Sequence, residues 1–96
     1  MFGAAVATKS IAVGSRCLCV EAGVGAMSSQ AVTNPRLGRR GLERLREGRP
    51  ADAVMADVLA TEAYPEKRQV LVLDRDGRAA AHTGSANRAW AGHVTR

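Results

Sequence analysis

Residues 21–42 decide the fold of this 96-residue chain and read EAGVGAMSSQAVTNPRLGRRGL. The small residues up to position 31 are typical of a strand, and the glycines at 23 and 25 indicate a bulge or a close approach of the backbone. Asn34 then predicts a helix N-cap, and Pro35 suits the first helical position because its missing N–H costs nothing there. The stretch therefore predicts a strand that runs directly into a capped helix.

Two helices are expected in the middle of the chain. The first is expected to run from Pro35 to about Glu47, with Gly48 as its left-handed C-terminal residue. The second is expected to open at Pro50 and to end at about Thr61. Apolar residues at helical spacing predict their buried faces: Leu37, Gly41, Leu42 and Leu45 on the first, and Ala51, Val54, Met55, Val58 and Leu59 on the second. The short connection makes them an αα-hairpin.

Strand patterns lie on both sides of the helices. Residues 2–8, 17–21 and 24–31 are the candidates before them, and residues 69–73 and 78–83 are those after them. Asp76-Gly77 supplies the positive φ of a tight hairpin turn. A calcium loop would need a Glu six residues past the glycine, where Thr83 stands, so turn chemistry is favoured. The order predicts an α+β fold with an αα-hairpin on one face of an antiparallel sheet.

Composition limits the size of the core and the class of partner. Hydrophobic residues make up 46% of the chain but only three are aromatic, so Ala, Val, Leu and Ile must form the core of a single domain. The net charge of +5 is concentrated in the arginines of residues 36–49. No aromatic residue is interleaved with them to stack on bases, so a solvated helix face is favoured over a nucleic-acid partner.

No cofactor, metal or membrane is expected from the sequence. Cys17 and Cys19 would share one face of a strand, and the chain lacks further ligands at metal spacing. No apolar run reaches the roughly 18–20 residues of a membrane span. The first residues lack the basic and apolar regions of a secretory signal, although a weak transit peptide stays an alternative. A cytoplasmic location is the default expectation.

Several of these segments match a known pattern in series and at matching spacing. They are residues 3–14, Glu21 to Ala26, Gln30-Ala31, Asn34-Pro35, Gly38-x-x-Gly41-Leu42, residues 69–77 and Thr83-Gly84-x5-Trp90-Ala-Gly-His93. In them the chain resembles an uncharacterised family related to the N-terminal nucleophile (Ntn) hydrolases, domain of unknown function ten-twenty-eight. The resemblance implies that residues 1–96 form a single partial domain, half of an Ntn-hydrolase-like αββα sandwich.

The resemblance also implies an activity. Ntn hydrolases cleave amides with an N-terminal Thr, Ser or Cys whose proton passes to the free α-amine. Met1 and Phe2 are not nucleophiles, and the family carries further strands before and after the matched segments. We therefore expect a member shortened at both ends, with an ancestral amide-hydrolase role but inactive in this form. A small amide-type substrate is expected only if the missing strand is restored.

Two other functions stay open at this point. One is a small basic binding module that uses the helix around Arg36–Arg49 on an acidic partner. The other is assembly, because a sheet that lacks neighbouring strands exposes edges that favour self-association.

Candidate site residues follow from the same segments. Lys9 and Ser10, at the end of the first expected strand, are the catalytic candidates, because a lysine there can lower the pKa of a neighbouring amine or hold a substrate carbonyl. Gln30 and Asn34, where the strand meets the helix, are expected to bind substrate, and so are Trp90 and His93. The alternatives are a surface lysine, an ordinary cap at Asn34 and a packed loop at Trp90 and His93.

Overall fold

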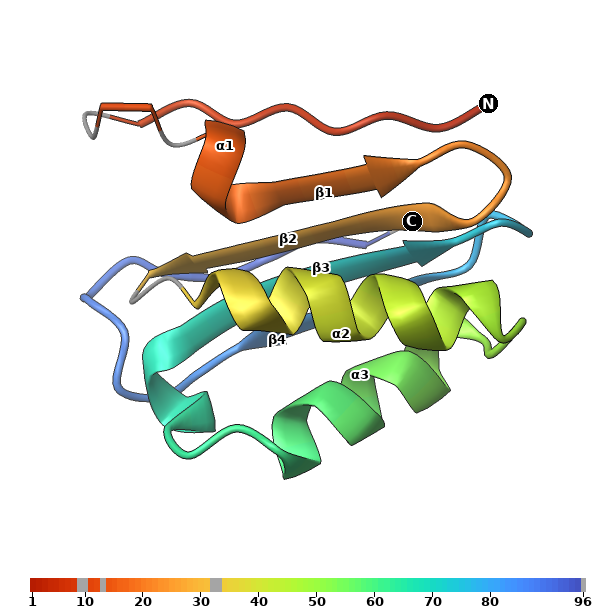
Figure 1. The fold of residues 1–96 in the computed structure, drawn as a ribbon. Coiled ribbons are helices and arrows are strands. Elements are labelled where there is room, and N and C mark those ends of the chain that lie inside the picture. Colours follow the sequence, from red (N-terminus) through yellow and green to blue (C-terminus); the bar gives the residue numbers. More distant parts are fainter. Residues whose placement is uncertain (9–10, 13, 32–33, 96) are drawn as a thin grey trace.

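The structure, a computed structural model, describes residues 1–8, 11–12, 14–31 and 34–95. Its elements are α1 (Gly14–Cys17), β1 (Leu18–Glu21), β2 (Gly25–Ala31), α2 (Pro35–Arg46), α3 (Ala51–Ala60), the short 3-10 helix η1 (Pro65–Lys67), β3 (Arg68–Asp74) and β4 (Ala79–Thr83). The strands form one layer and α2 and α3 form a second layer against it (Figure 1). The expected α+β fold, with both helices on one face of the sheet, is therefore confirmed. None of the described helices has the length and apolar character that a membrane crossing requires.

The sheet has four antiparallel strands in the order β1-β2-β3-β4. Side chains alternate between its two faces, and residues opposite one another in the register share a face. The face beneath α2 and α3, called here the covered face, includes Met27, Val70 and Val72. The other, called here the open face, carries Leu18, Val20, Ala26, Ser28, Gln30, Gln69, Leu71, Leu73, Ala79, Ala81 and Thr83.

The core lies between the covered face and the helices. Leu37 and Leu45 of α2 and Val54 and Val58 of α3 are buried against Met27, Val70 and Val72. Two glycines let α2 lie close to the sheet. A Cβ at Gly41 would overlap the Sδ atom of Met27, and a Cβ at Gly38 would lie 2.5 Å from the Sγ atom of Cys19.

The expected helix caps and turns are present. Asn34 Oδ1 accepts a hydrogen bond of 3.1 Å from Arg36 N, so the N-cap is confirmed. Gly48 has φ +83° at the end of α2, and Gly77 has φ +84° in the β3–β4 turn. Pro50 immediately precedes α3, and its extended backbone makes it the N-cap residue rather than the first helical residue.

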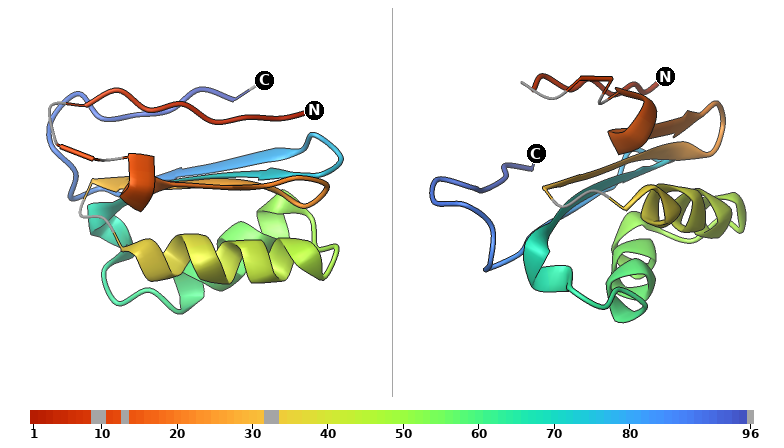
Figure 2. Two further views of the ribbon diagram at one scale, coloured as in Figure 1. Left: turned by 45° about the horizontal axis from the view of Figure 1, so that its top comes forward. Right: turned by 60° about the vertical axis from the view of Figure 1, so that its left-hand side comes forward.

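Three details of the expected strands are wrong. Residues 2–8 form no strand: they run extended across the open face rather than beside an edge of the sheet (Figure 2). An apolar, extended sequence becomes a strand only when a neighbouring backbone pairs with it, and composition cannot supply that neighbour. Cys17 is the last residue of α1, so it does not share a strand face with Cys19. Val24 lies in a turn, where its N–H donates to Glu21 O at 3.1 Å.

Candidate functional site

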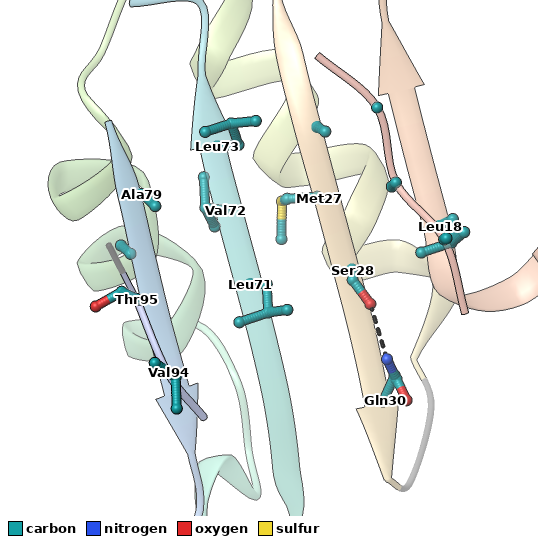
Figure 3. Close-up of a pocket in the computed structure, with 15 residues that line it drawn as sticks. Leu18, Met27, Ser28, Gln30, Leu71, Val72, Leu73, Ala79, Val94 and Thr95 are labelled. Carbon is teal, nitrogen blue, oxygen red and sulfur yellow. Dashed lines mark hydrogen bonds between the residues drawn. The ribbon is translucent and has the colours of Figure 1, made fainter. Parts of the chain in front are cut away.

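The open face contains a groove of about 350 Å³. Its floor comes from all four strands, and residues 3–5 and 94–95 line its sides (Figure 3). Residues 3–5 and 94–95 thus lie on the side of the sheet opposite the helices (Figure 2). None of the described residues that line the groove carries a charge.

A pair of polar side chains lies toward one end of the groove. Gln30 Nε2 donates to Ser28 Oγ at 3.3 Å, along the open face of β2. A hydroxyl that accepts one hydrogen bond keeps its own O–H as a donor, and the Gln30 amide also has a carbonyl oxygen that accepts. The Ser28–Gln30 pair therefore presents a donor and an acceptor next to the apolar floor.

A row of polar residues crosses the sheet at the same end. Gln30 is opposite Gln69, which is opposite Thr83. Gln69 Nε2 donates to Thr83 Oγ1 at 3.2 Å and to Gly92 O at 2.7 Å, and the second bond fixes which side of the amide carries the nitrogen. Thr83 Oγ1 and His93 Nδ1 are 2.9 Å apart. Because Oγ1 already accepts from Gln69, the contact suits a hydroxyl that donates to the imidazole.

The structure brings some of the predicted site residues together and separates others. Gln30 lies in the groove, and His93 joins the polar row through Thr83. Trp90 lies in the same C-terminal loop as His93, with φ +68° and a fully exposed ring. Lys9 and Ser10 lie outside the described residues.

Asn34 belongs to a separate polar cluster at the start of α2. Its Nδ2 donates to Glu62 Oε2 at 3.3 Å, and Arg68 Nη2 donates to Glu62 Oε1 at 3.2 Å. Burial alone raises the pKa of Glu62, but the hydrogen bonds from Tyr64 N and Arg68 hold this pKa below its ordinary value. Nε and Nη1 of Arg68 are buried and have no hydrogen-bond partner among the described residues. The cluster joins α2 to η1 and β3 and does not line the groove.

Asp74 is a buried carboxylate at the β3–β4 turn. Oδ1 accepts from Asp76 N and Arg78 N, and Oδ2 accepts from Ala51 N at 3.0 Å and Arg78 Nε at 2.8 Å. Burial raises the pKa of Asp74, but these bonds outweigh it and hold the pKa below its ordinary value. The carboxylate therefore joins the turn to the N-terminus of α3, and the interpretation of this segment as a turn is confirmed.

The arginines of residues 36–49 divide into two groups. Arg44 pairs with Glu47 at 3.3 Å, and Arg46 Nη2 pairs with Glu21 Oε2 at 2.5 Å. The hydrogen bond from Arg46 lowers the pKa of the exposed Glu21 carboxyl. Among the described residues, no carboxylate lies within ion-pair distance of the exposed side chains of Arg36, Arg39 and Arg40.

Comparison with known proteins identifies the family. The family of unknown function DUF1028 matches residues 1–96. The chain belongs to this family. The crystal structure of the DUF1028 protein SPO2555 from Silicibacter pomeroyi is similar to it, with a TM-score of 0.88 and 33% identity over 94% of this chain. The chain spans 40% of the length of that DUF1028 protein. Among curated proteins, none is significantly similar to the chain.

Three polar residues of this DUF1028 chain were not singled out from the sequence as site residues. Ser28, Gln69 and Thr83 lie on the open face because of the strand register. Alternation along β3 separates Gln69 from its buried neighbours, but only the pairing of β2 with β3 places Gln69 opposite Gln30. That pairing joins segments on either side of the two helices, so no local sequence signal contains it.

Proposed function

We propose that this DUF1028 chain is an Ntn-hydrolase-like protein that binds an amide-type substrate on the open face of its sheet and does not cleave it unaided. The observation that carries the proposal is the groove with the Ser28–Gln30 pair at its polar end. An amide presents a C=O that accepts and an N–H that donates, and this pair offers the complementary donor and acceptor.

The described part of the groove supplies binding groups but no base. Ser28 and Thr95 contribute hydroxyls to its lining, and none of the lining residues that the structure describes contributes an imidazole, an amine or a carboxylate. A hydroxyl becomes an effective nucleophile when a base within hydrogen-bond reach takes its proton. Thr83 and His93 form such a contact, but they lie outside the groove lining. We therefore propose binding without turnover for this chain, with an ancestral amide-hydrolase role.

Two measurements on the purified chain test this function. Titration of a simple aliphatic amide, followed by amide NMR, is expected to shift the signals of Ser28, Gln30 and Leu71. Assays for released ammonia or amine are expected to remain at background. Replacing Ser28→Ala and Gln30→Ala together should weaken binding about tenfold, because two hydrogen bonds are lost. The Arg39→Ala variant, on the exposed side of α2, should bind as the parent does.

Either of two results would contradict this function. NMR signal shifts in α2 and α3 instead of the open face would show that the amide does not bind in the groove. Release of amine at a rate proportional to protein, abolished by Ser28→Ala, would show that the groove cleaves amides without further chain.

A second candidate function is a basic binding module. It rests on Arg36, Arg39 and Arg40, whose exposed charges the described carboxylates do not neutralise. Anisotropy of a labelled acidic peptide should then rise with protein at low salt and fall steeply as salt screens the charges. Replacing the three arginines with glutamine should abolish this binding, and a salt-independent signal would exclude it.

A further inference from the structure

We infer that the groove selects neutral amides with an aliphatic chain and discriminates against amides that carry a charge at the far end of that chain. This inference rests on the proposed function, because it takes amide binding at the polar end as given. It adds the chemical character of the part of the ligand beyond the amide group.

The first argument is electrostatic. In a chain of which 24% of residues are charged, all strand positions of the open face are uncharged, and so is each residue within 1–8, 11–12, 14–31 and 34–95 that lines the groove. A charged group that leaves water for such a surface loses hydration and gains no partner. A neutral group does not incur this cost.

The second argument is the direction of the groove. Ser28 is opposite Leu71, and the next open-face row toward the β3–β4 turn is formed by Ala26, Leu73 and Ala79. Two residues along a strand advance about 7 Å, so a chain that extends from the amide at Ser28 and Gln30 toward Ala79 passes over apolar side chains of the sheet. Figure 3 shows Leu71 beside Ser28, and Leu73 and Ala79 farther along this path, away from the Ser28–Gln30 hydrogen bond.

The third argument is that this path is accessible and has sides. Leu71 is 41% exposed, in contrast to its fully buried neighbours on β3. Residues 3–5 lie along one side of the path, and Val94 and Thr95 lie along the other; all are small or apolar except Thr95, which adds a hydroxyl. Each methylene that enters such a groove should tighten binding by about two- to fourfold.

The test compares three ligands that share one amide group. Hexanamide is neutral, ω-aminohexanamide carries a terminal ammonium, and adipamate carries a terminal carboxylate. NMR titrations are expected to show that hexanamide binds about tenfold more tightly than either charged ligand. Acetamide, butanamide and hexanamide should bind with increasing affinity.

A charge placed in the groove provides a second test. The Ala79→Asp variant puts a carboxylate at the apolar end, on an exposed position of the edge strand β4. It should bind ω-aminohexanamide at least as well as hexanamide. Ala56→Asp makes the same change on the exposed side of α3 and should keep the parent preference. Dispersed NMR spectra of both variants establish that they are folded.

The outcomes separate this inference from the proposed function. Equal affinity of the parent chain for all three ligands would overturn the charge selectivity and leave amide binding intact. Equal binding of hexanol and hexanamide would instead overturn recognition of the amide at Ser28 and Gln30. If the Ala79→Asp variant still preferred hexanamide over ω-aminohexanamide, the aliphatic chain of the ligand would not lie along the path toward Ala79.

Discussion

The covered and open faces belong to the same four strands but differ in what they contain. The covered face buries Met27, Val70 and Val72. It also carries Asp74 and Arg68, the only charged residues that are buried in the described strands. The open face carries no charge, and Leu71 lies exposed between two buried valines. Alternation along a strand thus allows neighbouring residues to serve stability on one face and recognition on the other.

The largest effect is expected from Asp74→Ala at the edge of the covered face. The change leaves Ala51 N, Asp76 N and Arg78 N without their acceptor, and a buried hydrogen bond to a charged group is worth about 1.5–3 kcal/mol. The free energy of unfolding should fall by about 3 kcal/mol or more, measured by urea denaturation.

Asp76→Ala is the matched control on the same turn. Asp76 is exposed, and its carboxylate pairs with the exposed Arg78 side chain alone among the described residues. Its effect should be small. Equal destabilisation by the two variants would show that the turn, rather than the bonds of Asp74, determines stability here.

The next largest effect separates the two faces directly. Val70→Ala should lower the free energy of unfolding by about 2 kcal/mol, because it removes fully buried methyl groups and leaves a cavity. Leu71→Ala, one residue along β3, should change it by less than about 1 kcal/mol because the leucine is already in contact with water. If Val70→Ala and Leu71→Ala lowered the free energy of unfolding by similar amounts, measured by thermal or urea denaturation, the open face would be covered in solution.

Gly41→Ala should produce a smaller loss, about 1 kcal/mol. The added Cβ must displace Met27 Sδ, and overpacking of this kind costs about 1–3 kcal/mol. The gain in helix propensity from Gly to Ala offsets about 1 kcal/mol of this. Combining Gly41→Ala with Met27→Ala relieves the overlap, so the combined loss in urea unfolding should be less than the sum of the two. Additive losses would contradict the contact.

The smallest effect is the acid dependence of stability. The folded-state pKa values of Asp74 and Glu62 lie below their ordinary values, so their stabilisation is present above the unfolded-state pKa of about 4 and is lost as pH falls through the folded-state values. The urea concentration at which half of the protein is unfolded should therefore decrease as the pH drops below about 4. In the Glu62→Gln variant this decrease with pH should be shallower. The same pH dependence of the urea midpoint in Glu62→Gln and in the parent would contradict a stabilising role for the hydrogen bonds of the Glu62 carboxylate.

Local signals account for most of the fold that was anticipated. Asn34-Pro35 and Gly48 mark the ends of α2, and Asp76-Gly77 marks the hairpin, because each acts on the backbone within a few residues. The prediction of a strand at residues 2–8 was wrong because a strand forms only when the backbone of another segment, distant in the sequence, pairs with it. The contacts of Asp74 with α3 also follow from tertiary structure: the sequence indicates a turn there, but not a cap for a helix that ends well before it.

The candidate site was anticipated only in part, for the same physical reason. Gln30 was a candidate because it stands where a strand meets a helix, and His93 because it lies in a C-terminal segment with few such residues; both features are local and visible in the sequence. Their partners Ser28, Gln69 and Thr83 are ordinary strand residues, and they become a group through the register of β2, β3 and β4. Asn34 shows the reverse, since a residue that could line a site serves instead as a cap bonded to Glu62.

The order of the strands also bears on how the chain folds. β1 pairs with β2 and β3 pairs with β4 across short turns, whereas the central pair joins residues 25–31 to residues 68–74. Each hairpin can form by closing a short loop, but the central pair must also order α2 and α3 between its strands. The rate-limiting step is therefore expected to be the docking of the two hairpins, and the helix pair, as the segment between them, sets the entropy of that closure.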